Sequence, residues 1–156
     1  MLSIGDKVPA FSGTDQDGNV FHFRDHKKEK IILFFFPKSM TPTCTVQACN
    51  LRDNYKELKK LGFTVVGISP DEGALQKKFQ TTYKLPFILM QDTGHTIMNL
   101  FGVWGEKQLY GRKYDGVHRT TFVIENGKVV HVFKRPRNNR HAEEIIEFWR
   151  AVKNEN

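Results

Sequence analysis

Two cysteines, Cys44 and Cys49, are the residues whose type and spacing most directly offer chemistry in this chain. A cysteine thiolate is a nucleophile that oxidants convert to a sulfenic acid, and a second thiol can condense with that acid to give a disulfide. In an intact helix, residues five positions apart have Cα atoms about 8 to 9 Å apart and side chains about 140° apart. Because a disulfide needs Cα atoms within about 7 Å, a bond between these sulfurs would require local unwinding.

The segment that carries the cysteines predicts a buried strand followed by a helix. Residues 31–36 are uninterrupted apolar residues, typical of a strand buried on both faces in the middle of a parallel sheet. Pro37 ends this strand because it cannot donate to a ladder. Apolar residues then recur at helical spacing from Cys44 onward, and Gly62 provides a stop for the helix.

The start of this helix places Cys44 in its first turn. Thr41 and Pro42 fit an N-cap followed by proline at the first helical position. The free backbone N–H groups and the positive end of the helix dipole stabilise a thiolate there, which makes Cys44 a candidate nucleophile. The Thr41 hydroxyl has two open roles, either capping the helix or turning toward the sulfur. Cys49 falls off the apolar stripe of the helix, toward the surface.

Length and composition indicate one soluble globular domain, residues 1–156. Hydrophobic residues make up 39% of the chain and charged residues 26%, as in ordinary globular proteins. The N-terminal residues do not form a signal sequence, and no apolar stretch approaches the ~20 residues of a membrane span. We therefore expect a cytoplasmic location, no membrane partner, and a monomer or weak homodimer.

The charge pattern argues against nucleic-acid binding despite the formal net charge of +7. Lysine and arginine are spread over the chain, and the densest clusters, residues 27–30 and 134–137, are typical of solvated loops. Electrostatic steering of an acidic protein partner stays open. The six histidines show no paired spacing near the cysteines, so we expect neither a metal nor a cofactor.

The rest of the chain alternates strands and helices. We expect a hairpin turning at 15–19, strand 63–69, a helix beginning at 69–72, strand 87–90, a short helix over 94–101 with Ile97, Leu100 and Phe101 inward, a surface loop over 102–117, a hairpin over 119–133 and a final helix over 140–153. This order predicts an α/β fold with a central mixed β-sheet flanked by helices.

The spacing Pro37-x-x-x-Thr41-x-x-Cys44 after an apolar strand resembles the peroxiredoxin signature. Residues 41–49 resemble the bacterioferritin comigratory protein, or peroxiredoxin Q, subfamily. The resemblance continues in the same order through residues 50–53, 67–69, 101–107 and 118–122, and so covers nearly the whole chain. One position departs from the pattern, because relatives usually carry glycine before the reactive cysteine and Thr43 stands here. A β-branched residue would be strained if that position needed positive φ.

The resemblance implies a thioredoxin-like fold with an added N-terminal β-hairpin. It also implies a peroxidase that reduces hydrogen peroxide and organic hydroperoxides, is recycled by thioredoxin or a similar dithiol reductant, and serves antioxidant defence. Gln47 and Trp104 are expected to support the shape of the site.

The same resemblance implies roles for five residues. Cys44 would be the peroxidatic cysteine and Cys49 the resolving cysteine. Arg119 would be the fixed cation beside the sulfur, since arginine stays protonated and its planar fork can contact two groups. Thr41 would hydrogen-bond the thiolate and the peroxide, and Pro37 would shield the sulfur from bulk water.

Two other classes remain open from the residues alone. A thioredoxin-type dithiol-disulfide oxidoreductase is disfavoured because four residues, not two, separate the cysteines. A redox-inert binding domain would use both cysteines as small buried hydrophobes. Rapid thiol loss with hydrogen peroxide would distinguish a peroxidase from either.

Overall fold

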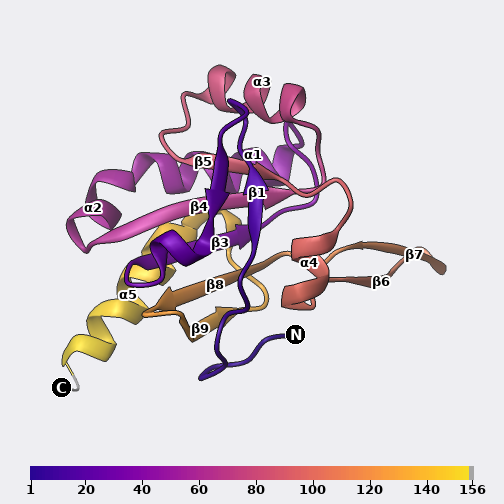
Figure 1. The fold of residues 1–156 in the computed structure, drawn as a ribbon. Coiled ribbons are helices and arrows are strands. Elements are labelled where there is room, and N and C mark those ends of the chain that lie inside the picture. The colour runs from indigo at the N-terminus through magenta and orange to yellow at the C-terminus, as the bar shows by residue number, and fades with distance from the viewer. Residues whose placement is uncertain (155–156) are drawn as a thin grey trace.

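The apolar run predicted as a buried strand forms the centre of a five-stranded sheet (Figure 1). β3 (Lys30–Phe35) pairs in parallel with β4 (Phe63–Ser69) on one side and antiparallel with β8 (Thr120–Glu125) on the other. β5 (Ile88–Gln91) lies beyond β4 and β9 (Lys128–Phe133) beyond β8. The computed structural model describes residues 1–154, and its sheet is mixed, as the sequence predicts.

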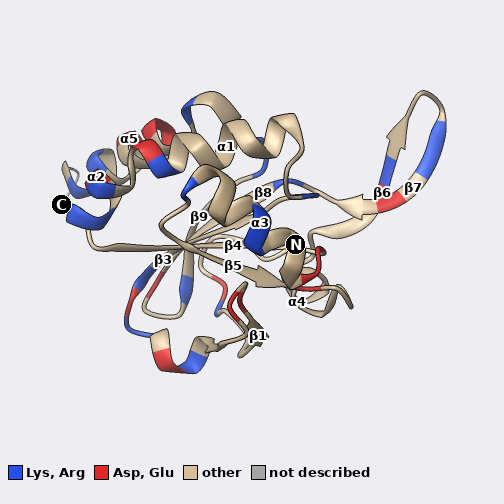
Figure 2. Ribbon diagram, turned by 90° about the horizontal axis from the view of Figure 1, so that it is seen from above, with Lys and Arg blue, Asp and Glu red and all other residues tan. Residues whose placement is uncertain are grey.

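Within residues 1–154, four helices cover one face of this sheet. They are α1 (Pro42–Asp53), α2 (Tyr55–Lys60), α3 (Gly73–Tyr83) and α5 (His141–Asn154). Their buried side chains join those of alternate strand residues in one hydrophobic cluster. Figure 2 shows these helices on one side of the sheet, with α4 and the N-terminal hairpin on the other.

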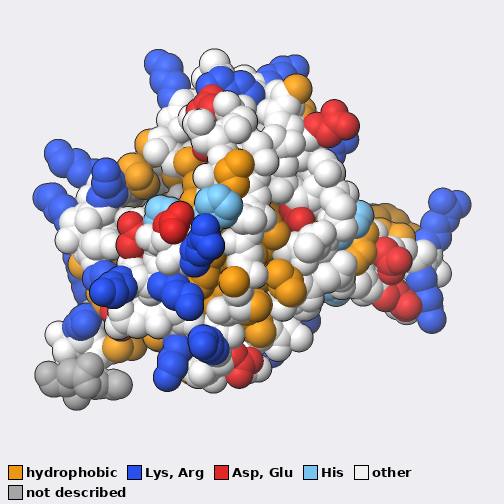
Figure 3. All heavy atoms as spheres, viewed as in Figure 1, with side chains coloured by type: hydrophobic (Ala, Val, Ile, Leu, Met, Phe, Trp, Pro, Cys, Tyr) orange, Lys and Arg blue, Asp and Glu red, His pale blue; other side chains and the backbone are white. Residues whose placement is uncertain are grey.

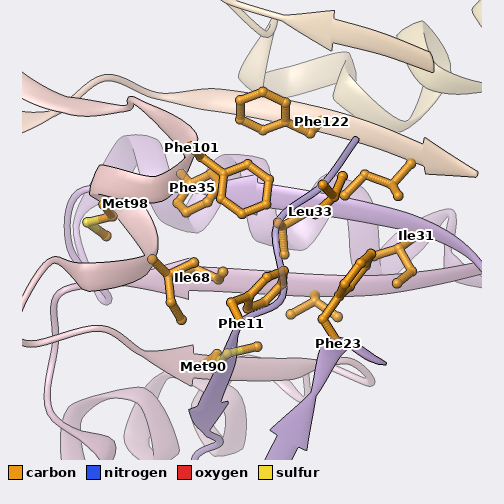
Figure 4. Packing of buried hydrophobic residues seen from close by; sticks show 14 of the residues in the cluster. Phe11, Phe23, Ile31, Leu33, Phe35, Ile68, Met90, Met98, Phe101 and Phe122 are labelled. Atoms are coloured by element: carbon orange, nitrogen blue, oxygen red, sulfur yellow. The ribbon is translucent and has the colours of Figure 1, made fainter. Parts of the chain in front are cut away.

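The hydrophobic cluster on the opposite face packs six phenylalanine rings among aliphatic side chains. α4 (Thr96–Phe101) and the hairpin of β1 (Ser12–Thr14) and β2 (Val20–His22) cover it. The short 3-10 helix η1 (Phe23–His26) follows β2, and Phe23 from its first position is fully buried. In Figure 4 these rings meet side chains that alternate along β3, which explains why the strand is apolar throughout.

The prediction of one helix from Cys44 to the stop at Gly62 is wrong in one respect, because this segment forms two helices. Asn54 interrupts it with φ −110° and ψ 10°. The Asn54 amide donates to the Asn50 carbonyl at 2.9 Å and to the Glu143 carboxylate of α5 at 3.1 Å. An asparagine side chain that competes for a helix carbonyl favours a break. Gly62, with φ 89°, ends the second helix as predicted.

The segment 102–117 is not a loop, contrary to expectation. It forms a two-stranded antiparallel ribbon of β6 (Trp104–Leu109) and β7 (Arg112–Val117) that projects from the body (Figure 1). Tyr110 and Gly111 make its two-residue turn with φ 51° and 78°. The ribbon has mostly exposed side chains, so it lacks the alternating apolar pattern by which a strand is recognised.

The short helix before this ribbon differs from the prediction in one inward residue. Leu100 of α4 is 41% exposed rather than buried, whereas Met98 is fully buried together with Ile97 and Phe101. The other predicted hairpin is confirmed, because Asn126 and Gly127, both with positive φ, connect β8 to β9.

α5 is anchored to the sheet through a buried histidine. The His141 ring bonds the Thr121 hydroxyl of β8 at 2.8 Å and the Glu144 carboxylate at 3.0 Å, and the η2 turn (Asn138–Arg140) leads into the helix. Burial acts to raise the pKa of Glu144, but hydrogen bonds from His141 and from the Arg137 N–H outweigh it and lower that pKa.

Candidate active site

Cys44 lies where the sequence places it, at the third residue of α1 and 2% exposed. Thr41 is the N-cap residue with extended backbone, and Pro42 is the first helical residue. Thr43 is helical, so the strain that a β-branched residue would suffer at positive φ does not arise there. Positive φ in this loop falls instead on Met40, at 70°.

Arg119 contacts the Cys44 sulfur although 75 positions separate them. Its Nη2 donates to the sulfur at 3.1 Å. The antiparallel register of β3 and β8 pairs Phe35 with Thr120, so the loop that follows β3 and the residue that precedes β8 meet at one end of the sheet. A hydrogen bond from a charged donor such as a guanidinium is stronger than one between neutral groups.

Gln47 holds the other side of the guanidinium. Its Oε1 accepts a hydrogen bond from Arg119 Nη1 at 2.6 Å, and the residue is fully buried one turn after Cys44. Its Nε2 has no hydrogen-bond partner among residues 1–154. The sequence offered a usable signal for this role, since an amide stands on the buried stripe of α1 next to Cys44.

Thr41 has the expected N-cap position, but among residues 1–154 its hydroxyl bonds neither the α1 backbone nor the Cys44 sulfur. Its hydroxyl donates to the Lys38 carbonyl at 2.7 Å, and within the described part of the chain its side chain makes no capping bond to α1. The Thr41 carbonyl accepts the Thr45 N–H at 2.9 Å and the Thr45 hydroxyl at 2.7 Å. Pro37 is the second residue after the end of β3, following Phe36, and is half-buried.

Cys49 lies further along α1, half-buried, and both cysteines are free. Burial raises the pKa of the Cys49 thiol, Arg52 opposes this by its positive charge, and Asp53 adds to it. With α1 intact, the Cα atoms of the two cysteines are about 8 to 9 Å apart, too far for a disulfide.

Trp104 lies at the root of the projecting ribbon. Its ring stacks on His95 at 3.6 Å and packs against the hydrophobic cluster under α4. These contacts hold the start of β6, in the ribbon that leads to Arg119.

The described residues contain no group of three or more His, Cys, Asp and Glu side chains that could hold a metal ion. Lysine and arginine side chains are scattered over the face shown in Figure 3 rather than gathered in one patch. No helix within residues 1–154 is long and apolar enough to cross a membrane.

Comparison with known proteins agrees with this geometry. Residues 4–132 match the model of the AhpC/TSA family. The chain is 44% identical over 146 residues to peroxiredoxin Bcp of Escherichia coli strain K12, covering 93% of this chain and 94% of that one. Peroxidoxin BcpB of Mycobacterium tuberculosis is 34% identical, with a TM-score of 0.85 and coverage of 97% and 99%.

The fold is shared more widely than the sequence. A cysteine-to-serine mutant of Xylella fastidiosa PrxQ superposes with a TM-score of 0.91 over 98% of both chains at 22% identity. These matches confirm the α/β, thioredoxin-like fold that the resemblance implied. The chain belongs to the AhpC/TSA family and, within it, to the peroxiredoxins of the bacterioferritin comigratory protein type.

Proposed function

We propose that Cys44 is the peroxidatic residue of a thiol peroxidase acting on hydrogen peroxide and organic hydroperoxides. The Cys44 thiolate attacks the terminal oxygen of ROOH, the O–O bond breaks, and the alkoxide leaves as ROH after taking a proton. Cys44 is oxidised to a sulfenic acid. The observation that supports this most is the 3.1 Å contact between Arg119 and a buried sulfur at a helix N-terminus. A Xanthomonas campestris bacterioferritin comigratory protein with the same fold is described as having alkyl peroxide reduction activity.

Arg119 serves two stages of this reaction. It stabilises the thiolate before attack, and its charge stabilises the negative charge that develops on the leaving oxygen. Gln47 fixes the guanidinium plane, so little reorganisation is needed during the reaction. Thr41 exchanges its bond to the Lys38 carbonyl for one to the bound peroxide, and Pro37 shields the sulfur from water.

We propose that Cys49 resolves the sulfenic acid. Its thiol displaces the hydroxyl from Cys44, giving a disulfide and water, after the first turns of α1 unwind. The C-terminal half of α1 can stay in place. Asn50 Oδ1 accepts the Ala142 N–H of α5 at 2.7 Å, and its amide donates to the Glu143 carboxylate at 3.2 Å. Unwinding would therefore be confined to residues 42–49.

A dithiol protein such as thioredoxin would complete the cycle. It reduces the Cys44–Cys49 disulfide by thiol exchange and becomes oxidised itself. Two free cysteines suit a reducing compartment, so we place the reaction in the cytoplasm, carried out by a monomer or a weak homodimer. The physiological role would be antioxidant defence and redox homeostasis.

Single-turnover oxidation of two serine variants tests this scheme. C44S should lose peroxide reduction entirely. C49S should reduce one equivalent of peroxide at the normal rate, and thioredoxin should then fail to recycle it. Mass spectrometry should show Cys44 overoxidised to sulfinic acid. Thiol loss in the unaltered protein no faster than in free cysteine would contradict the peroxidase. Full turnover of C49S would assign resolution to another thiol.

A further inference from the structure

Asp71 lies just beyond the C-terminal end of β4 and contacts the loop that precedes Cys44. Its Oδ2 accepts a hydrogen bond from the backbone N–H of Ser39 at 2.7 Å and another from the Ser69 hydroxyl at 2.8 Å. Ser39 and Asp71 are 32 positions apart, and the parallel pairing of β3 with β4 brings together the segments that follow these strands. The carboxylate therefore joins the Cys44 loop to the sheet.

The hydrogen bonds continue inward from Asp71. Gln76 Nε2 donates to the Ser69 hydroxyl oxygen at 2.8 Å and to the Met90 carbonyl of β5 at 2.9 Å. Ser39, Ser69 and Gln76 are each at most 1% exposed. Displacing Asp71 would leave the buried Ser39 N–H and the Ser69 hydroxyl without their acceptor, which resists movement of the loop.

The loop at the outer end of this chain contains a strained residue. Met40 directly follows Ser39 and adopts φ 70°, which a residue with a Cβ disfavours. Thr41, the next residue, is the N-cap of α1, and Cys44 follows in the first turn. Non-glycine residues keep such a conformation only where surrounding contacts impose it. The bond from the Ser39 N–H to Asp71 is a contact of that kind, one residue before the strained position.

We propose that Asp71 is a positioning residue for peroxide reduction, which it assists by holding the Met40 turn from which α1 starts and Cys44 meets Arg119. The inference rests on the proposed function. Asp71 acts through the Ser39 backbone and takes no part in the bond changes at the sulfur.

Removal of the acceptor tests the proposal. In D71A, the rate constant for oxidation of Cys44 by hydrogen peroxide should fall about tenfold, equivalent to ~1.4 kcal/mol in activation free energy. D71N should stay within about threefold of the unaltered protein, because an asparagine carbonyl oxygen can accept the same two bonds. Glu72 provides the matched control. It is the exposed neighbour, its side chain makes no capping bond to α3 within residues 1–154, and E72Q removes the same charge without unpairing the loop.

The M40G substitution distinguishes a positioning role of Asp71 from a general loss of stability in D71A. Glycine adopts positive φ freely, so in the M40G background the D71A substitution should slow oxidation by less than about threefold. A merely structural role for Asp71 would not respond to M40G. If circular dichroism shows D71A unfolded, S69A replaces it and should be about two- to threefold slower, because it removes one of two donors to the same oxygen.

The outcomes distinguish this inference from the proposed function. The role of Asp71 would be overturned if D71A oxidised as fast as the unaltered protein, or if D71A slowed oxidation by the same factor with and without M40G. Where D71A does not fold, an unchanged S69A rate would overturn it. Failure of the unaltered protein to react faster than free cysteine would overturn the peroxidase itself.

Discussion

Replacing Arg119 with methionine removes the charge beside Cys44 while keeping a long, unbranched side chain. Two bonds are lost, one to the Cys44 sulfur at 3.1 Å and one to Gln47 at 2.6 Å. A hydrogen bond to a charged group contributes about 1.5 to 3 kcal/mol. If the sulfur contact alone acts in the rate-determining step, oxidation of Cys44 should slow by about 10- to 150-fold, since each ~1.4 kcal/mol changes a rate tenfold.

A lysine at the same position tests whether geometry matters as well as charge. An ammonium group is a point charge and cannot face both the sulfur and Gln47 as the planar guanidinium of Arg119 does. R119K should therefore lie between R119M and the unaltered protein.

The second-order rate constant for hydrogen peroxide, measured by stopped flow or by competition with a peroxidase of known rate, checks both variants. Arg135 supplies the control, since it is exposed in the loop after β9 and R135M should react normally. An R119M protein as fast as the unaltered one would refute the assignment of Arg119 as the cation of the site.

Three further predictions concern titration and stability. In C44S, burial should shift the pH profile of Cys49 alkylation above that of free cysteine, and urea should reverse the shift; mass spectrometry checks this. Glu144 has a lowered pKa in the folded state, so it stabilises the protein above its unfolded-state pKa, and this stability is lost as pH falls through the folded value. In E144Q, the free energy of unfolding in urea should therefore change less with pH between neutral pH and about pH 3 than it does in the unaltered protein. N50A should lower the free energy of unfolding, measured in urea, by about 1 to 3 kcal/mol, because the Ala142 N–H loses its acceptor.

The strand, loop and first turn around Cys44 were predictable because their signals are local. An uninterrupted apolar run, a proline and an N-cap dipeptide each specify backbone within a few residues of themselves. The apolar stripe of α1 also indicated that Cys44 points inward and Cys49 outward, and their burial agrees.

The remaining features depend on partners that lie far away in the sequence. The Asn54 side chain, which competes locally for the Asn50 carbonyl at the break after α1, also bonds Glu143, 89 positions later. The contact between Arg119 and Gln47 follows from the register of β3 and β8, which residue spacing does not reveal. The projecting ribbon was not predicted, because a strand is recognised in sequence by apolar residues that alternate along its buried face. Most side chains of this ribbon are exposed, so that alternation is missing.

The two halves of α1 differ in what holds them, and this difference gives the proposed cycle its order. The second half is tied to α5 through Asn50, by bonds that do not depend on the redox state of the sulfur. The first half is tied to Arg119 through both Cys44 and Gln47, and of these two bonds the one to Cys44 is strong only while the sulfur is anionic. Oxidation to a neutral sulfenic acid weakens that bond. The chemical step would thus weaken one of the two Arg119 bonds that hold the turns that must unwind before Cys49 can reach the oxidised sulfur, and would leave the bond to Gln47 in place.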